Sequence, residues 1–351
     1  MFCWGRDAGG MIGDGTPIAD TPEERARPIP VPVLGLSDPL AEVGEGFAIT
    51  ARREVFLWKP LIWVLGEGRA VHEPRTRAAP WSLAPADTRQ LALGTNFGCA
   101  RDGDGRVRCA GSNASGALGD GTTVSRAEFA LVPLLRPAVS IAAAESRACA
   151  ALEGGQLVCW GRDPLRSVSR NCEPSLHGDP PAQAAAPHDL CGPTPHIDRI
   201  PVPVAGASGV VDVALGGDAG CARLRDGGVV CFGANDRGQL GDGTRTGRSE
   251  AAPVRGLRGA VAQLAMGYGT VCARYADGTV DCWGSLALNN MTAPTRVPGL
   301  DDATDIATRL TTSCAVRARD GNIWCWGTLD AGFEPDPARG AETPAALRWK
   351  R

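Results

Sequence analysis

Short apolar stretches separated by Gly-containing turns recur along the chain. In the clearest copy, residues 221–233, a Cys-Ala step is followed by Asp-Gly and then by Val-Cys-Phe-Gly. Similar copies occupy residues 99–111, 149–161, 272–284 and 314–327. A short apolar run on each side of a Gly turn is typical of two strands joined by a hairpin. The pattern therefore predicts an all-β fold built from many short strands.

A second element follows the first in several copies and sets the length of the repeat. The sequence Gly-Gln-Leu-Gly-Asp-Gly-Thr occupies residues 238–244, and variants of it occupy 116–122 and 10–16. A further apolar strand, such as residues 261–265, then leads into the next Cys-Ala. The period is about 50 residues, which gives about seven units. A degenerate copy is expected near residues 46–58, and Cys3-Trp4-Gly5 is the end of a copy whose first half is absent.

This ordered set of motifs resembles the regulator of chromosome condensation repeat family, as a disulfide-rich variant of bacterial type. The resemblance covers nearly the whole chain. It implies a β-propeller of about seven four-stranded blades, with one blade incomplete at the N-terminus. Residues 1–351 would then form a single propeller domain, and residues 162–200, which depart from the period, would form a disulfide-tied loop insertion within it.

Composition narrows the class of partner. The 46 Gly and 27 Pro favour turns over long helices, and no apolar run reaches the roughly 18 residues of a membrane span. The formal net charge of −3 argues against a nucleic-acid partner, because such proteins usually carry a basic excess. Lys occurs only at Lys59 and Lys350, which indicates a GC-rich genome.

The spacing of the Cys residues predicts disulfides between neighbouring strands. In four copies the first Cys lies six residues before the hairpin Gly and the second lies four residues after it. A three-residue loop ending at Gly227 sets Cys221 directly opposite Cys231, at a separation that a disulfide tolerates. The same argument gives three more pairs: Cys99 with Cys109, Cys149 with Cys159, and Cys272 with Cys282.

Two further pairs need separate arguments. Cys314 and Cys325 are one residue further apart, which a β-bulge could absorb. Cys172 and Cys191 lie together in the insertion, and Cys3 is left over. Two alternatives stay open: reduced, buried Cys acting as small apolar residues, and zinc ligation, which the lack of paired Cys-x-x-Cys spacings disfavours.

Thirteen Cys residues in such pairs indicate an oxidising compartment, so we expect an extracellular, periplasmic or cell-surface protein. The first residues contain neither the basic nor the apolar segment of a signal peptide. A missing N-terminal piece would explain this, and it would also supply the partner of Cys3.

Three further sets of residues are candidates for a site. Trp4, Trp160, Trp283 and Trp326 occupy one repeat position, and we interpret them as filling between blades rather than as a binding surface. The Asp-Gly-Thr turns at 14–16, 120–122 and 242–244 offer too few oxygens for calcium, and we interpret them as structural turns. The insertion carries the residues expected to bind a partner, with a metal or catalytic patch as the alternative: His177, Asp179, His188, Asp189 and His196.

Three functions fit this sequence. The first is a non-enzymatic, monomeric interaction module without a cofactor or metal, whose loops bind a protein or a cell-surface glycan. The second, implied by the resemblance, is guanine-nucleotide exchange on a small GTPase, which requires a cytosolic or nuclear protein. The third is a polysaccharide-active enzyme on a propeller scaffold, for which no acid–base pair can be named. The Cys pairing and the charge favour the first function.

Overall fold

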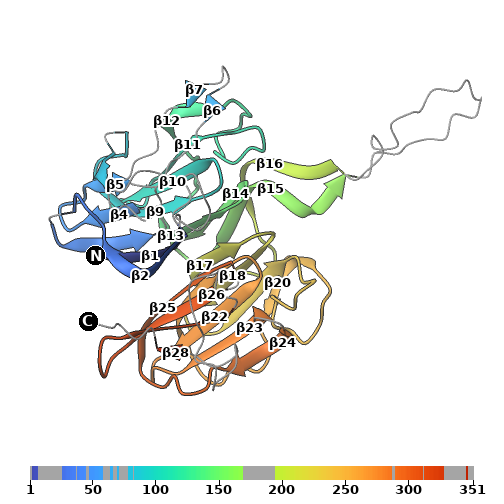
Figure 1. Cartoon of the computed structure of the whole chain (residues 1–351). Helices are drawn as coiled ribbons and strands as arrows, with labels where there is room; N and C mark the ends of the chain where they lie inside the picture. Colours follow the sequence, from blue (N-terminus) through green and yellow to red (C-terminus); the bar gives the residue numbers. More distant parts are fainter. Residues whose placement is uncertain are drawn as a thin grey trace, which may run out of the picture.

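The computed structural model describes residues 2–6, 26–36, 38–44, 47–57, 64–65, 69–70, 78–81, 83–168, 194–286, 289–310, 312–327 and 345–346. These residues form strands and turns and contain no helix. Six four-stranded sheets account for most of them. The protein is therefore an all-β propeller with four-stranded blades, as the resemblance of its repeats implies (Figure 1).

We name the four-stranded sheets blades A to F in chain order. Blade A contains β3 (Leu40–Gly44), β4 (Phe47–Thr50), β5 (Val55–Leu57) and β8 (Ala79–Pro80). Blade B contains β9 (Thr88–Leu93), β10 (Phe97–Asp102), β11 (Val107–Gly111) and β12 (Arg126–Leu131). Blade C contains β13 (Ala138–Ala144), β14 (Arg147–Leu152), β15 (Leu157–Val168) and β16 (Thr194–Pro203).

Blade D contains β17 (Val210–Gly216), β18 (Ala219–Leu224), β19 (Val229–Gly233) and β20 (Arg248–Pro253). Blade E contains β21 (Val261–Met266), β22 (Thr270–Tyr275), β23 (Val280–Leu286) and β24 (Asn289–Arg296). Blade F contains β25 (Ala303–Arg309), β26 (Thr312–Arg317), β27 (Ile323–Gly327) and β28 (Ala345–Ala346). A short ribbon of β6 (Val64–Leu65) and β7 (Arg69–Ala70) lies between β5 and β8 in the chain.

Each blade is an antiparallel meander, and the blades stack on one another in chain order. Within each blade the four strands pair in the order in which they occur in the chain, so we call them the first to fourth strands. The first strands of successive blades are in contact, as in β9 with β13 and β13 with β17. The second strand of a blade also contacts the first strand of the next, as in β14 with β17 and β22 with β25. The first strands therefore lie innermost, which is the arrangement of a propeller.

The apolar core lies between the blades. One buried cluster joins Phe97 and Cys99 of blade B to Ile141 and Trp160 of blade C, and similar clusters join C to D, D to E and E to F. The second strands are covered on both faces, so they take small residues. The Ala of each Cys-Ala step exposes 2 % of its surface or less: Ala100, Ala150, Ala222, Ala273 and Ala315. This double burial explains the most regular motif in the sequence.

The number of complete blades differs from the prediction. β1 (Phe2–Arg6) and β2 (Ala26–Pro32) form a two-stranded sheet in which three residues of β2 face a single residue of β1. The same irregularity, three residues of one strand facing one residue of the other, occurs between the third and fourth strands of blades B, C, D and E. The β1–β2 pair thus matches the third and fourth strands of an incomplete unit. The prediction of about seven four-stranded blades is wrong in its count, because only six units have all four strands among the described residues.

The degenerate copy expected near residues 46–58 coincides with the second and third strands of blade A. No helix in the described part of the chain is long and apolar enough to cross a membrane.

Candidate functional site

The third and fourth strands of blade C extend beyond the blade as a hairpin. β15 has 12 residues and β16 has 10, whereas β11 and β19 have 5 each. Pairing continues from Gly161, opposite Asp198, out to Val168, opposite Thr194 (Figure 1). Residues 162–168 and 194–200 of the expected loop insertion are therefore paired strands. This corrects the loop interpretation for these residues, because their backbones continue the antiparallel ladder of the blade.

We call the side of the propeller from which this hairpin projects the hairpin face. Because the strands alternate in direction, the connections from first to second strand and from third to fourth strand all reach this face. Large apolar side chains are exposed on these connections and at the base of the hairpin: Val124 (61 %), Ile197 (36 %), Ile200 (53 %), Tyr268 (45 %) and Leu310 (53 %). Exposed apolar side chains on a rigid scaffold can anchor a partner protein, and on this face they occur together with the projecting hairpin. A second group of exposed apolar residues lies at the opposite face: Leu83, Leu131, Leu135 and Val139.

The two sides of the hairpin base differ in character. On the side of blade B, the Cγ2 of Ile197 lies 2.9 Å from the point where a Cβ on Gly116 would stand, so the Ile packs against the neighbouring loop. On the side of blade D, His196 Nε2 and Asp198 Oδ1 are hydrogen-bonded at 2.9 Å, and Asp163 lies opposite His196 in the ladder. The two sides therefore make different contacts: Ile197 touches the loop of blade B, and the other side carries the His196–Asp198 pair.

Of the five residues expected to form the partner-binding loop, His196 is the one that the structure describes. His177, Asp179, His188 and Asp189 lie outside the described residues, so their role stays a prediction. Sequence reasoning did not identify the exposed Ile197, Ile200 and Tyr268. Their residue types alone do not distinguish an exposed position on a projecting strand from a buried one.

Five of the six expected Cys pairs face each other across the second and third strands. Their Sγ atoms are 1.98 to 2.11 Å apart and their Cα atoms 4.0 to 4.1 Å apart: Cys99 with Cys109, Cys149 with Cys159, Cys221 with Cys231, Cys272 with Cys282, and Cys314 with Cys325. Gly227 has a φ of +85°, the left-handed conformation that the three-residue loop requires. The predicted pair of Cys172 and Cys191 lies outside the described residues.

The sequence predicts that the extra residue between Cys314 and Cys325 lies in a β-bulge. The structure corrects this prediction. The ladder between β26 and β27 runs without a register shift, with Ala315 opposite Trp324. Instead, the Arg317 N–H donates to the Asn322 carbonyl and closes a turn one residue longer than the turn of blade D. A turn absorbs an extra residue more easily than a paired strand does, because its backbone groups can bond to water.

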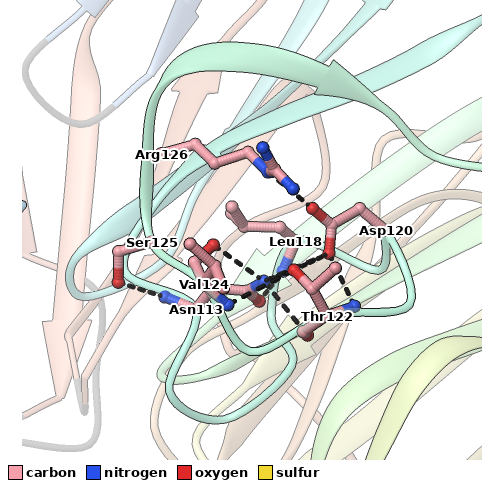
Figure 2. Close-up of polar contacts among 7 residues, drawn as sticks. All are labelled: Asn113, Leu118, Asp120, Thr122, Val124, Ser125 and Arg126. Carbon is pink, nitrogen blue, oxygen red and sulfur yellow. Dashed lines mark hydrogen bonds and ion pairs between the residues drawn. The ribbon is translucent and has the colours of Figure 1, made fainter.

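The Asp-Gly-Thr turns are held in place by a buried Asn (Figure 2). Asn113, with no exposed surface, donates from Nδ2 to Asp120 Oδ1 and to the carbonyls of Thr122 and Val124, at 3.1–3.2 Å. The other oxygen of Asp120 accepts a bond from Arg126 Nε at 2.8 Å. The carboxylate is therefore engaged by donors of the protein.

Blade D repeats this arrangement around Asn235. These contacts support the interpretation of the turns at 120–122 and 242–244 as structural. The turn at 14–16 lies outside the described residues.

The repeated Trp residues lock each of these loops onto the next blade. Trp160 and Trp283 are buried, and their Nε1 atoms donate to the carbonyls of Ala117 (2.9 Å) and Gln239 (3.0 Å) in the loop of the preceding blade. The interpretation of these two Trp residues as filling between blades is confirmed, although the sequence did not reveal the hydrogen bonds. Trp326 is also buried, but its Nε1 has no acceptor among the described residues, since blade E lacks the Gly-Gln-Leu-Gly loop.

Comparison with known proteins agrees with this geometry. Residues 89–117 and 210–239 match the family described as regulator of chromosome condensation (RCC1) repeat. Both segments run from a first strand through the Cys hairpin to the loop that follows it. These two segments are therefore similar to RCC1 repeats.

Solved structures of similar fold span nearly the whole chain. Human WBSCR16 has a TM-score of 0.72 at 18 % identity, covering 99 % of this chain and 94 % of its own. Yeast RCC1 (Prp20), bound to Kap60, has a TM-score of 0.73 at 18 % identity, covering 99 % and 83 %. Prp20p from Saccharomyces cerevisiae, reported with its binding properties to Gsp1p and histones, has a TM-score of 0.71, also at 18 % identity, covering 99 % and 86 %. At this level of identity the likeness shows a common fold.

Proposed function

We propose that this chain is a non-enzymatic, exported propeller of bacterial origin whose hairpin face binds a partner protein. The observation that carries the proposal is the projecting β15–β16 hairpin together with exposed apolar side chains on the same face, of which Ile200 (53 %) at the hairpin base and Tyr268 (45 %) on blade E are examples. Apolar side chains at the centre of a binding face supply most of the affinity when a partner excludes water from them.

The scaffold beneath this face supports the proposal because it is stiff. At the interfaces B/C and D/E the loop of one blade is hydrogen-bonded to the Trp of the next, and five Cys pairs tie second strands to third strands. A pre-organised surface loses little conformational entropy on binding. The Cys pairs also support an oxidising compartment, where such bonds persist, and the composition, with Lys only at Lys59 and Lys350, fits a GC-rich bacterial genome.

Site-specific photo-cross-linking in the native host tests this proposal. A photo-reactive amino acid at position 197 is expected to give one discrete adduct with a partner. The same group at position 135, where Leu135 is 88 % exposed on a connection from fourth to first strand at the opposite face, is the matched control and is expected to give none. The adduct should be lost when residues 169–193 are replaced by a short Gly-Ser linker. Equal adducts from both positions would contradict the proposal.

Similarity of fold to Prp20p favours a second candidate, an exchange factor for a small GTPase. Release of a fluorescent guanosine diphosphate from small GTPases of the host separates the two functions. Under the leading proposal the rate of release stays at the spontaneous value. An acceleration of tenfold or more that depends on the hairpin face would favour the exchange factor.

A further inference from the structure

A cavity lies between blades C and D, where the repeat lacks its sealing loop. At the interfaces B/C and D/E, the loop between third and fourth strands covers the Trp of the next blade. Blade C has the projecting hairpin instead of this loop, and blade D has Phe232 at the Trp position. The resulting cavity, about 240 Å³ in volume, is lined by Arg147, Asp163, Val202, Pro203, Phe232 and Glu250 among others.

The residues that line the cavity include a buried Arg with two unpartnered nitrogens. Arg147 exposes only 6 % of its surface, and its Nε and Nη2 atoms have no hydrogen-bond partner among the residues that the structure describes. Its Cζ lies 5.5 Å from the centroid of the Phe232 ring. The corresponding positions, two residues before the first Cys of the other four hairpins, carry Phe97, Ala219, Thr270 and Thr312, so Arg is a departure from the repeat. An unpaired polar group in a buried site is costly, which points to a ligand.

The charges around Arg147 limit what this ligand can be. Burial lowers the pKa of the guanidinium, and the attraction of Asp163 and Asp218 opposes that effect only in part. Asp163, Asp198 and Glu250 line the cavity together with Arg147 and Arg162. One negative charge is therefore favourable beside Arg147, whereas a second would meet the acidic rim.

We propose that this cavity binds a monocarboxylate with a short aliphatic stem. Nε and Nη2 form one edge of the guanidinium, which is covered in this structure. Once the side chain turns that edge toward the cavity, the two nitrogens can donate in parallel to the two oxygens of a carboxylate. The stem would lie on Phe232 and Pro203. Such a group occurs in a small free acid and in the side chain of a Glu from another protein. The site does not depend on a partner bound to the hairpin face.

Titration of the oxidised full chain with sodium acetate and sodium butyrate tests the site. The reporter is the Nε–H resonance of Arg147 in protein labelled with ¹⁵N-arginine, at ionic strength held constant with NaCl. Saturable shifts are expected, with butyrate binding about tenfold more tightly than acetate, because each buried methylene contributes about threefold. Inorganic phosphate is expected to cause no saturable shift. The Arg317 resonance is the internal control, since this buried Arg is already paired with Asp302 (Nε to Oδ1 2.6 Å).

Two variants make the result decisive. Arg147→Met lacks the Nε–H reporter, so its binding of butyrate is followed instead by saturation-transfer NMR of the ligand. The signal seen with the unmodified protein should be abolished in this variant. Glu250→Gln changes an exposed side chain at the rim and should tighten butyrate binding two- to threefold at low salt, since it removes a repulsive charge. Absence of a saturable shift, an equal response to phosphate, or weaker binding in Glu250→Gln would overturn the proposal.

Two capped peptides identify the source of the carboxylate. If Gly-Gly-Glu-Gly-Gly binds more tightly than butyrate and its Gln analogue does not bind, the ligand is a Glu side chain of another protein. If butyrate binds more tightly, the ligand is a free acid. Both results support the carboxylate site, whereas binding of the Gln peptide as tightly as the Glu peptide would refute it.

Discussion

Replacing Asn235 with Ala tests whether a single buried amide holds a loop to the propeller. Asn235 exposes 1 % of its surface, and its Oδ1 accepts a bond from the Leu240 N–H at 3.0 Å. Its Nδ2 lies 3.1–3.3 Å from Asp242 Oδ1 and from the carbonyls of Thr244 and Thr246. Nδ2 has two hydrogens, so these contacts amount to two donated bonds and one accepted bond.

The expected cost follows from this count. Each lost bond contributes about 1 kcal/mol, and a buried N–H or carbonyl left without a partner costs somewhat more. The Leu240 N–H is buried, whereas Thr244 and Thr246 are exposed and water can reach their carbonyls. We therefore expect Asn235→Ala to lower the free energy of unfolding by about 3 kcal/mol.

Urea unfolding of the oxidised protein, followed by circular dichroism, measures the change. Hydrogen exchange of the Leu240 amide reports on the loop itself, and its protection should fall at least a hundredfold. Asn290→Ala is the matched control, because Asn290 is exposed and is expected to change stability by less than about 0.5 kcal/mol. If Asn235→Ala behaves like this control and the Leu240 amide stays protected, the reasoning is wrong.

Three further predictions follow from other parts of the molecule. Without reduction, the ten Cys residues of the five described pairs should resist alkylation in denaturant. If Cys172 is also paired with Cys191, only one of the 13 thiols should react. The intact mass of the alkylated protein measures the number of thiols that reacted. Labelling of most thiols would contradict the pairs. Gly241→Ala should destabilise the protein by at least 1–2 kcal/mol more than Gly243→Ala in urea unfolding. Both glycines have a positive φ, but a Cβ at Gly241 would lie 2.8 Å from Trp283 Nε1, while no atom of the described residues lies within 4 Å of one at Gly243. Equal losses would refute this steric argument. Burial raises the pKa of Glu42 from 4.5 to about 7, so the folded state holds this proton more tightly and stability should fall as the pH rises from 4.5 through 7. Glu42→Gln should remove that fall and add on the order of 2 kcal/mol at pH 8; an unchanged pH profile of urea unfolding would contradict the assignment.

Much of the fold was accessible from the sequence because its signals are local. The Cys hairpins were predicted with their register, since a three-residue turn with a left-handed Gly fixes which residues face each other. The inter-blade position of Trp160 and Trp283 was also predicted. The number of complete blades was not predicted correctly. The third and fourth strands of a unit carry the same motifs whether or not its first two strands are present.

The site was less accessible, because it depends on how blades meet. The residues 162–200 were recognisable as an insertion from their break in the period, yet the sequence could not show that their two ends pair into a projecting hairpin. Arg147 had one available signal, its departure from the apolar or small residue found at the same place in other copies. That signal gained meaning only when Phe232, about 85 residues further on, was seen to lie beside it.

The sequence by itself determined the all-β class, the repeat, the Cys pairing within each described hairpin and the turns of the repeat. All of these depend on interactions between residues fewer than about twenty positions apart. Only the tertiary structure decided which apolar side chains stay exposed on the hairpin face and where a cavity remains between blades C and D. Exposure and cavities depend on whether a neighbouring blade supplies a loop to fill the space, and that contact joins residues more than 40 positions apart, as between Trp160 and Ala117.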